Sequence, residues 1–149
     1  MPAPAFPPQD PAYAARVRAS FARQKAMDLI GARLTAVEPG AAEVRLAFRQ
    51  ELTQQKGFVH GGIVGMIADS ACGYAAYSLM PATSSLVTVE YKINILAPAR
   101  GDLVARGAVV RPGRTLTVTR AEVHDAQGTH VASMQQTLMM LPDTADTPE

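Results

Sequence analysis

The segment Gly57–Leu79 contains groups whose types and spacing could do chemistry. His60-Gly61-Gly62 stands at the expected start of a helix, and Asp69 follows nine residues after the histidine as the lone carboxylate of an apolar run. At a helix start the backbone N–H groups have no intrahelical partner and sit at the positive end of the dipole. Because glycine has no Cβ, a substrate carbonyl can approach these donors closely. The pattern therefore predicts a site that stabilises a developing oxyanion.

Asp69 is flanked on its helix face by positions without side chains. Gly65 and Gly73 lie one turn before and one turn after it, with Gly62 and Met66 near the same line. Each glycine costs roughly 1 kcal/mol relative to alanine inside a helix. The stripe indicates a groove in which a substrate or another chain can lie. The alternative is that the glycines only permit tight packing of a sheet and that the acid faces solvent, and spacing alone leaves both open.

The remaining histidines and the single cysteine give weaker signals. For His60 we favour a role in positioning the loop by hydrogen bonding to backbone, with catalysis as the alternative. Cys72 has no nearby charge that would stabilise a thiolate, so we expect it to be a packing residue. His124 and His130 lie on or beside an expected hairpin without an acidic or cysteine cluster at ligand spacing, so we expect no metal site. Motifs for phosphate or dinucleotide binding are missing, and no cofactor is expected.

The elements before this segment follow from capping and turn residues. Asp10 is a plausible N-cap with proline after it, and Gly31 would stop the helix that begins there. Two alternating segments then flank Pro39-Gly40, as the strands of a hairpin do. The sequence thus predicts one helix over 10–31 and two strands within 32–40 and 41–50.

The elements after the central helix alternate apolar and polar residues at period two. Turn residues separate four such segments, which we predict to be strands in a meander: 85–98, 102–113, 115–128 and 130–141. Small residues on the central helix allow a sheet to approach it closely. The predicted fold is α+β, with a mainly antiparallel curved sheet wrapped around one long central helix.

Length and composition limit the number of domains, the partners and the location that we expect. The chain of 149 residues has the size of one domain, which we place at 10–141, between a flexible N-terminal segment (1–9) and a flexible C-terminal tail (142–149). The charge is nearly balanced, with 14 Lys+Arg and 13 Asp+Glu, so neither nucleic acid nor a membrane surface is an expected partner. The first residues do not have the pattern of a signal peptide and no apolar run reaches membrane length, so we expect a cytoplasmic protein.

The "HGG" motif followed by an acid nine residues after its histidine resembles the hot-dog-fold acyl-CoA thioesterases, nearest to the phenylacetate-pathway (PaaI-like) type. The likeness runs from about Ser20 to Met140. The segment "LTQQKGFVHGGIVGMIADSACGYAA" carries most of it, while "SFARQKAMDLIGARLTAVEPGAAEVRL", "VTVEYKINILAPARGD" and "GRTLTVTRAEVHDAQGTHVA" match successive blocks less specifically.

This resemblance implies roles for particular residues. Asp69 would be the catalytic carboxylate, acting as nucleophile or as general base for water, and the Gly61 N–H would polarise the thioester carbonyl. Gln54 would orient the water or the carbonyl, and Thr88 would lie near the attacking water. Family members usually build each site across a homodimer, with Asp69 of one chain facing Gly61 of the other, and often pair dimers into tetramers.

The substrate implied by the resemblance is an acyl-CoA, hydrolysed without a metal or redox cofactor. We expect the substrate to touch the helix start and the walls of the slot, and the arginines of the "RPGR" turn to meet CoA phosphates or to be ordinary turn residues. The acyl group stays open between aryl and aliphatic. The predicted substrate-binding residues are Gly62, Phe58, Met66, Tyr74, Tyr91, Arg111 and Arg114.

Two other functions compete with hydrolysis. One is a non-catalytic acyl-CoA or acyl-carrier binding domain, which would not require Asp69, Gln54 and the glycines of the motif. The other is a hot-dog hydratase or dehydratase, which would want a histidine and an acid poised on the β-carbon of the acyl group. Here the histidine stands at the helix start, an arrangement that resembles the thioesterases instead.

Overall fold

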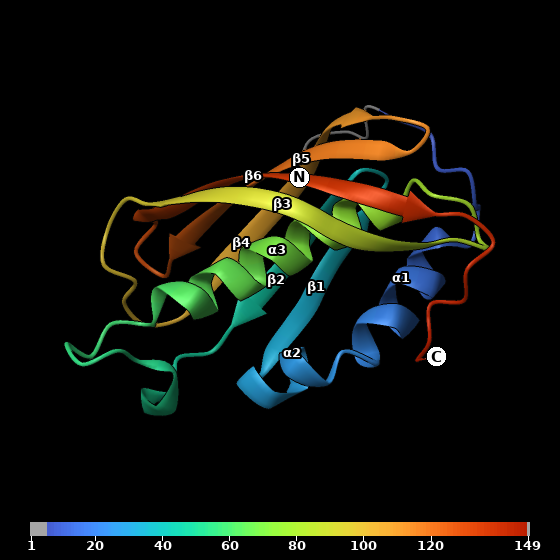
Figure 1. Cartoon of the computed structure of the whole chain (residues 1–149). Helices are drawn as coiled ribbons and strands as arrows, with labels where there is room; N and C mark the ends of the chain where they lie inside the picture. The colour runs from blue at the N-terminus through green and yellow to red at the C-terminus, as the bar shows by residue number, and fades with distance from the viewer. Residues whose placement is uncertain (1–5, 149) are drawn as a thin grey trace.

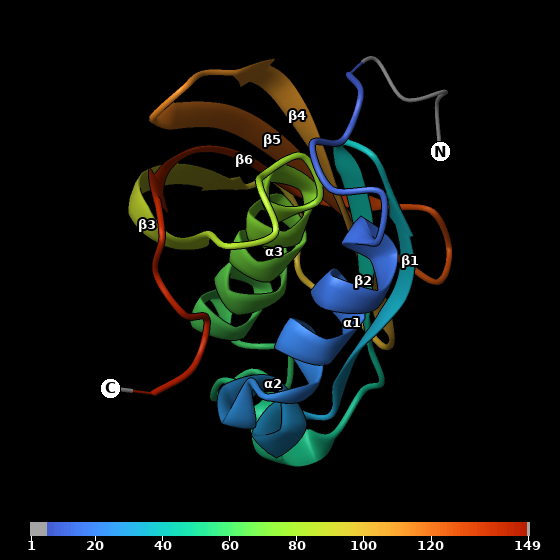
Figure 2. The ribbon, with the colours of Figure 1, turned by 90° about the vertical axis from the view of Figure 1, so that its right-hand side faces the viewer.

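The long helix α3 (Gly61–Tyr77) crosses the concave face of a curved antiparallel sheet in the computed structural model of the chain, which describes residues 6–148 (Figure 1). A view from the side shows the sheet curving around α3 and α1 lying between α3 and β1 (Figure 2). The strand order is β1-β2-β4-β5-β6-β3. The strands are β1 (Ala32–Glu38), β2 (Ala41–Leu46), β3 (Ser85–Ile95), β4 (Leu103–Pro112), β5 (Leu116–Asp125) and β6 (His130–Leu141). The predicted α+β fold with a sheet around one helix is confirmed.

The single helix predicted over 10–31 is wrong: the structure has α1 (Tyr13–Ala22) and α2 (Lys25–Ile30). The break falls at Gln24, whose backbone is extended, with ψ at 96°. It lets Val17 of α1 pack beside the C-terminal half of α3, while Met27 of α2 packs beside the N-terminal half. One straight helix could not pack against both halves of α3 in this way.

The predicted helix ends are right at one end only. Asp10 is not the N-cap of α1, since that position is Ala12. The Asp10 carboxylate instead accepts the Ala12 N–H at 2.9 Å and pairs with Arg16 at 2.8 Å. Gly31 does end the helical segment, because its φ of +77° is a left-handed conformation that glycine adopts at no steric cost.

The predicted meander of four strands is wrong for its first member. Strand β3 pairs with β6, from Ser85 opposite Leu141 to Ile95 opposite Ala132, and not with β4. Period-two alternation says which face a residue occupies, but it does not say which strand lies alongside. The hairpin β1–β2 and the succession β4–β5–β6 are as predicted.

The sheet comes very close to α3 at Gly107 of β4. A Cβ placed there would lie 2.3 Å from the carbonyl oxygen of Ala71 on α3, so no larger residue fits without moving the helix. Ala68, Ala71 and Cys72 are fully buried on the facing side of the helix. The small residues of α3 therefore do permit close packing of the sheet, as expected.

Residues 142–148 run past α1 and the loop before β3. The Thr144 N–H donates to the Thr83 carbonyl at 3.1 Å, and the Asp146 carboxylate pairs with Arg23 at 2.9 Å. Residues 1–5 and 149 lie outside the described range, and the predicted flexibility of both ends stays a prediction. No helix within residues 6–148 is long and apolar enough to span a membrane.

Candidate active site

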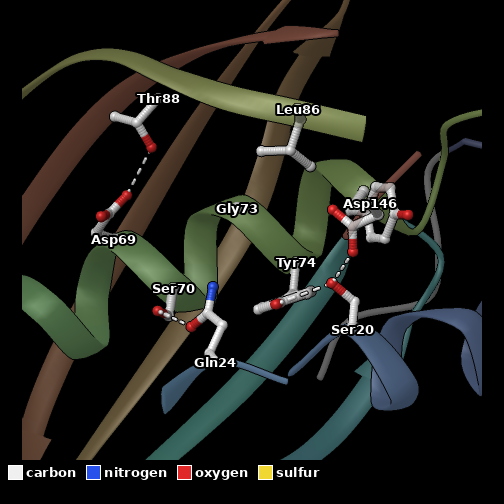
Figure 3. Close-up of a pocket in the computed structure, with 10 residues that line it drawn as sticks. Ser20, Gln24, Asp69, Ser70, Gly73, Tyr74, Leu86, Thr88 and Asp146 are labelled. Carbon is white, nitrogen blue, oxygen red and sulfur yellow. Dashed lines mark hydrogen bonds between the residues drawn. The ribbon is translucent and has the colours of Figure 1, made fainter. Parts of the chain in front are cut away.

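The carboxylate of Asp69 is held by side chains from two strands. Its Oδ1 accepts a hydrogen bond from the Thr88 hydroxyl of β3 at 2.9 Å and from Nε2 of Gln136 of β6 at 2.6 Å. Figure 3 shows Asp69 on α3 and Thr88 on β3 pointing toward one another. The same Gln136 Nε2 also donates to Thr88 at 2.9 Å, which closes a triangle of three side chains. One carboxylate oxygen is thereby fixed in place.

The other carboxylate oxygen is free to react. Among residues 6–148, no donor bonds to Oδ2 of Asp69, and the residue is half-buried. An oxygen with this freedom can attack a carbonyl carbon or take a proton from water, provided a substrate is brought within reach. The triangle thus separates a structural oxygen, Oδ1, from a chemically available one, Oδ2.

Gln136 is a site residue that the sequence analysis did not identify. It is fully buried, and its Oε1 has no hydrogen-bond donor within the described part of the chain. The signal was present in the alternation of β6, where Gln136 occupies an inward position between the buried Met134 and Leu138. A long polar side chain at such a position needs a partner, and here the partner is the carboxylate of Asp69.

A cavity of about 160 Å³ begins at Asp69 and runs along α3 toward its C-terminal end. Gly73 forms part of its floor and Leu86 of β3 part of its wall (Figure 3). Gly65 does not line it, because that position packs under the Tyr91 hydroxyl, 3.8 Å from where a Cβ would stand. The stripe therefore borders a cavity at Gly73 but not at Gly65, and Asp69 is bonded to two strands instead of facing solvent.

The far wall of the cavity is polar and includes the C-terminal segment. Asp146 accepts hydrogen bonds from the hydroxyls of Ser20 and Ser85, the latter at 2.9 Å. Ser20 also contacts the Tyr74 hydroxyl at 3.1 Å, and Figure 3 shows these side chains gathered at the end opposite Asp69. Burial raises the pKa of Tyr74 to about 12, so its hydroxyl stays protonated near neutral pH. Of the predicted substrate-binding residues, Tyr74 is the one that lines this cavity.

The start of α3 offers one free donor. His60 is the N-cap, and its Nδ1 accepts the Gly62 N–H at 2.8 Å, which is the positioning role that we favoured. The Gly61 N–H has no acceptor among the described residues, and Gly61 is exposed. Because eight residues of helix rise about 12 Å, Gly61 and Asp69 of one chain cannot act on the same carbonyl.

The other predicted site residues do not meet Asp69 within this chain. The Gln54 side chain accepts the Lys56 N–H in the loop before α3. Phe58 lies under the Arg100 guanidinium at 4.5 Å from its ring centre, and Met66 packs against the core. Arg111 near the end of β4 and Arg114 in the turn after it are exposed. The adjoining part of β4 bonds to Gly40, which donates to Ser78 at the C-terminal end of α3, the end opposite Gly61.

The expectations for Cys72 and for the pair His124 and His130 have different outcomes. Cys72 is fully buried, and burial raises the pKa of its thiol to about 12, which fits a packing residue. The expectation that no acid accompanies His124 and His130 is wrong, because Glu122 places a carboxylate oxygen within 4.8 Å of both rings' nitrogen ligands. Glu122 and His124 are two residues apart on β5, and pairing with β6 adds His130.

The fold and the sequence match a known class of proteins. Residues 56–132, just over half of the chain, match the family model described as the Thioesterase superfamily. The chain belongs to this superfamily, with the hot-dog fold that the resemblance implied. It is by family a hydrolase of thioesters.

Three particular relatives bear on this assignment. A thioesterase family protein from Silicibacter pomeroyi has a crystal structure that is 47% identical, with a TM-score of 0.85, covering 87% of this chain and 98% of that one. The Escherichia coli protein named medium/long-chain acyl-CoA thioesterase YigI is 25% identical over 96 residues, 55% of this chain and 62% of that protein. The PaaI protein of the E. coli phenylacetic acid degradation operon has a TM-score of 0.82 at 21% identity, covering 89% and 95%, which is a likeness of fold.

Proposed function

We propose that the chain is an acyl-CoA thioesterase that hydrolyses its substrate to a free acid and CoA. The observation that carries the proposal is the half-buried Asp69 carboxylate at the edge of a cavity of acyl size, with Oδ1 fixed by Thr88 and Gln136 and Oδ2 without a donor among residues 6–148. A CoA thioester as substrate is supported by family membership and by the activity for which the relative YigI is named.

In the proposed reaction, the thioester carbonyl carbon lies next to Oδ2 of Asp69. This oxygen either attacks the carbon or takes a proton from the water that does, while a Gly61 N–H stabilises the oxyanion. If water attacks, the carbon–sulfur bond breaks and the acyl carbon keeps the oxygen of that water. If Oδ2 attacks, the carbon–sulfur bond breaks to leave a mixed anhydride with Asp69, which a water molecule then hydrolyses to the free acid and the carboxylate. In both cases the sulfur leaves as the thiolate of CoA. Since a thiolate is a good leaving group, no strong acid has to protonate it, and neither metal nor redox cofactor is needed.

The proposed active unit is a homodimer. Gly61 and Asp69 are separated by about 12 Å along one helix, so the Gly61 donor that faces Asp69 would come from a second chain. Strand β3, at the sheet edge, leaves Val89, Tyr91 and Ile95 about half exposed, at 52%, 47% and 49%. An unpaired apolar edge beside the site is where a second copy would complete both sheet and active site. Pairing of dimers into tetramers stays a prediction, as does the cytoplasmic location.

The acyl group is proposed to be small. A dry cavity of roughly 150 Å³ in another protein is known to hold a benzene ring, and the cavity here is about 160 Å³. The hydroxyls of Ser20 and Tyr74 at its far wall favour an acyl group with a polar end, such as a hydroxylated aryl ring. Because Asp146 closes that end, CoA would leave on the Asp69 side, and Arg111 and Arg114 of a partner chain are the candidates for its phosphates.

The competing functions have less support. For a hydratase, the required histidine would be His60, but its Nδ1 is engaged by the Gly62 N–H. A non-catalytic binding domain would not require a carboxylate, Asp69, that is held in place by Thr88 and Gln136.

A panel of thioesters tests the proposal. Release of free thiol is measured from phenylacetyl-CoA, hydroxybenzoyl-CoA and short and long aliphatic acyl-CoAs, and hydration of an enoyl-CoA is measured in parallel. We expect thiol release, fastest with the aryl substrates, and no hydration. Binding of acyl-CoA without thiol release from any member would support the non-catalytic domain instead, and hydration without thiol release would support the hydratase.

A further inference from the structure

The outer face of the sheet, opposite α3, carries a cluster of three side chains that the proposed hydrolysis does not use. Glu122, His124 and His130 each offer one ligand atom, and these three atoms all lie within 4.8 Å of one another. The neighbouring residues Ala121 and Val123 point inward and are buried, so Glu122 and His124 lie on the opposite face. We propose that this cluster is a binding site for a divalent transition metal, with Zn²⁺ as the ion that fits it best.

The tautomer of His130 supports metal binding. Its Nε2 lies 3.0 Å from the Ala132 carbonyl oxygen and 3.1 Å from the Ser133 hydroxyl. A carbonyl can only accept, so Nε2 carries the hydrogen and Nδ1 keeps its lone pair. A ligating histidine usually donates its other ring N–H to a carbonyl or carboxylate in this manner. The hydrogen bond that would orient His130 as a ligand is therefore already made.

His124 supplies an unsatisfied polar atom. Its Nδ1 is shielded from solvent and has no hydrogen-bond partner within residues 6–148. A shielded polar atom without a partner costs roughly 1–3 kcal/mol. The His124 ring stacks on that of His130, with centres 4.7 Å apart and planes inclined by 12°. A cation bound by both rings would give this nitrogen a partner, and because in-plane lone pairs of nearly parallel rings do not converge, one ring would have to turn out of the stack to bind it.

The carboxylate of the cluster is also uncommitted. Glu122 forms no ion pair in the described part of the chain, although Arg106 stands opposite it on β4. Arg106 instead directs its Nε to Glu43, at 3.0 Å. The turn that joins the two strands is rigid, because Asp125 accepts the N–H groups of Gln127 at 3.0 Å and Thr129 at 2.8 Å. The ligands thus sit on a stable hairpin.

The donor set selects the ion. Two imidazoles and one carboxylate with an open fourth position form a set that Zn²⁺ commonly takes, with bonds of about 2.0–2.2 Å. In tetrahedral geometry such bonds place ligand atoms roughly 3.3 Å apart, so closing the cluster from its present span of up to 4.8 Å requires one imidazole to rotate out of the stack. A hard ion such as Mg²⁺ prefers oxygen ligands and is not expected to compete. An ion bound there would cross-link β5 and β6 next to the turn that joins them.

The test uses the full chain without any added histidine tag, stripped of metal with a chelator. Calorimetric titration with Zn²⁺ is expected to show one ion per chain, and Co²⁺ is expected to give the visible absorption of a tetrahedral complex. Loss of an outer hydrogen-bonding partner typically weakens metal binding roughly 10–100-fold. His124→Gln and His130→Gln remove ligands, so each is expected to weaken binding at least as much, and Glu122→Gln by a smaller factor.

The matched control is His60→Asn, which changes the third histidine of the chain and keeps an N-cap side chain at the start of α3. It should bind Zn²⁺ with unchanged affinity and stoichiometry. Circular dichroism checks that all variants are folded. Failure of the native chain to bind one equivalent of Zn²⁺, equal binding by the His124→Gln, His130→Gln double variant, or loss of binding in His60→Asn would each overturn the proposal.

Discussion

The C-terminal segment sets an upper limit to acyl length if the cavity next to Asp69 holds the acyl group. Asp146 closes the far end by accepting hydrogen bonds from Ser20 and Ser85 and by pairing with Arg23. Behind it lies a further space of about 260 Å³, lined in part by residues 145–148 themselves. Asp146→Ala removes all three contacts and should release the segment, which opens the far end of the cavity.

The expected gain follows from apolar burial. Each buried CH₂ contributes about 0.8 kcal/mol, so three additional methylenes entering the opened channel would contribute about 2.4 kcal/mol. At about 1.4 kcal/mol per factor of ten, kcat/KM for the longer acyl-CoA should rise about 50-fold relative to that for the short one. The assay is thiol release across an even-numbered series of acyl-CoAs, comparing the native chain, Asp146→Ala and a chain ending at Leu141.

The matched control for this series is Asp143→Asn, which changes an exposed carboxylate of the same segment. Its acyl-length profile should equal that of the native chain. If Asp146→Ala and the shortened chain also keep the native profile while remaining folded and active, the segment does not bound the acyl pocket and the reasoning is refuted.

Three further predictions concern packing and titration. Gly107→Ala should lower the free energy of unfolding by roughly 1–3 kcal/mol or more, because its Cβ would clash with backbone of α3 at 2.3 Å; an unchanged urea midpoint would contradict this. Cys72, whose thiol has a pKa of about 12 through burial, should not react with a coloured disulfide reagent in the native chain, yet should give one equivalent of thiol in denaturant. Burial alone would raise the pKa of Glu43, but hydrogen bonds from Arg45 and Thr35, with the nearby arginine charges, hold it below 4.5. The unfolded chain therefore binds the proton more tightly, so the stabilisation of the fold by ionised Glu43 is present above pH 4.5 and is lost as the pH falls below it. The thermal midpoint of Glu43→Gln should therefore depend less on pH below pH 4.5 than that of the native chain.

Local patterns in the sequence were sufficient for one part of the site. His60, Gly61 and Asp69 belong to one helix, whose period places them without knowledge of the rest of the chain. Thr88 entered through the resemblance to a family. Gln136 stands 67 residues from Asp69, and only the packing of β6 against α3 brings it there, so alternation could mark it as unusual but could not name its partner.

The parts of the fold that could not be predicted share a cause. The order of strands depends on which edges pair, and the pattern of each strand is the same whichever neighbour it has. The break at Gln24 depends on the shape of α3, against which both short helices pack. The approach of Glu122 to His130 likewise depends on the register of β5 against β6. Each is a tertiary contact between segments that carry no mutual signal in the sequence.

The most direct test of the account is the kcat of thiol release by Asp69→Asn, measured with the best acyl-CoA of the panel and beside Asp28→Asn, which changes an exposed acid of α2. Asparagine keeps an oxygen that can accept from Thr88 and Gln136, so the fold and acyl-CoA binding should persist. We predict that kcat falls about 10²–10⁴-fold, while Kd for acyl-CoA and the kcat of Asp28→Asn stay at native values. An Asp69→Asn variant that releases thiol at close to the native rate would contradict the central claim that this carboxylate performs the hydrolysis.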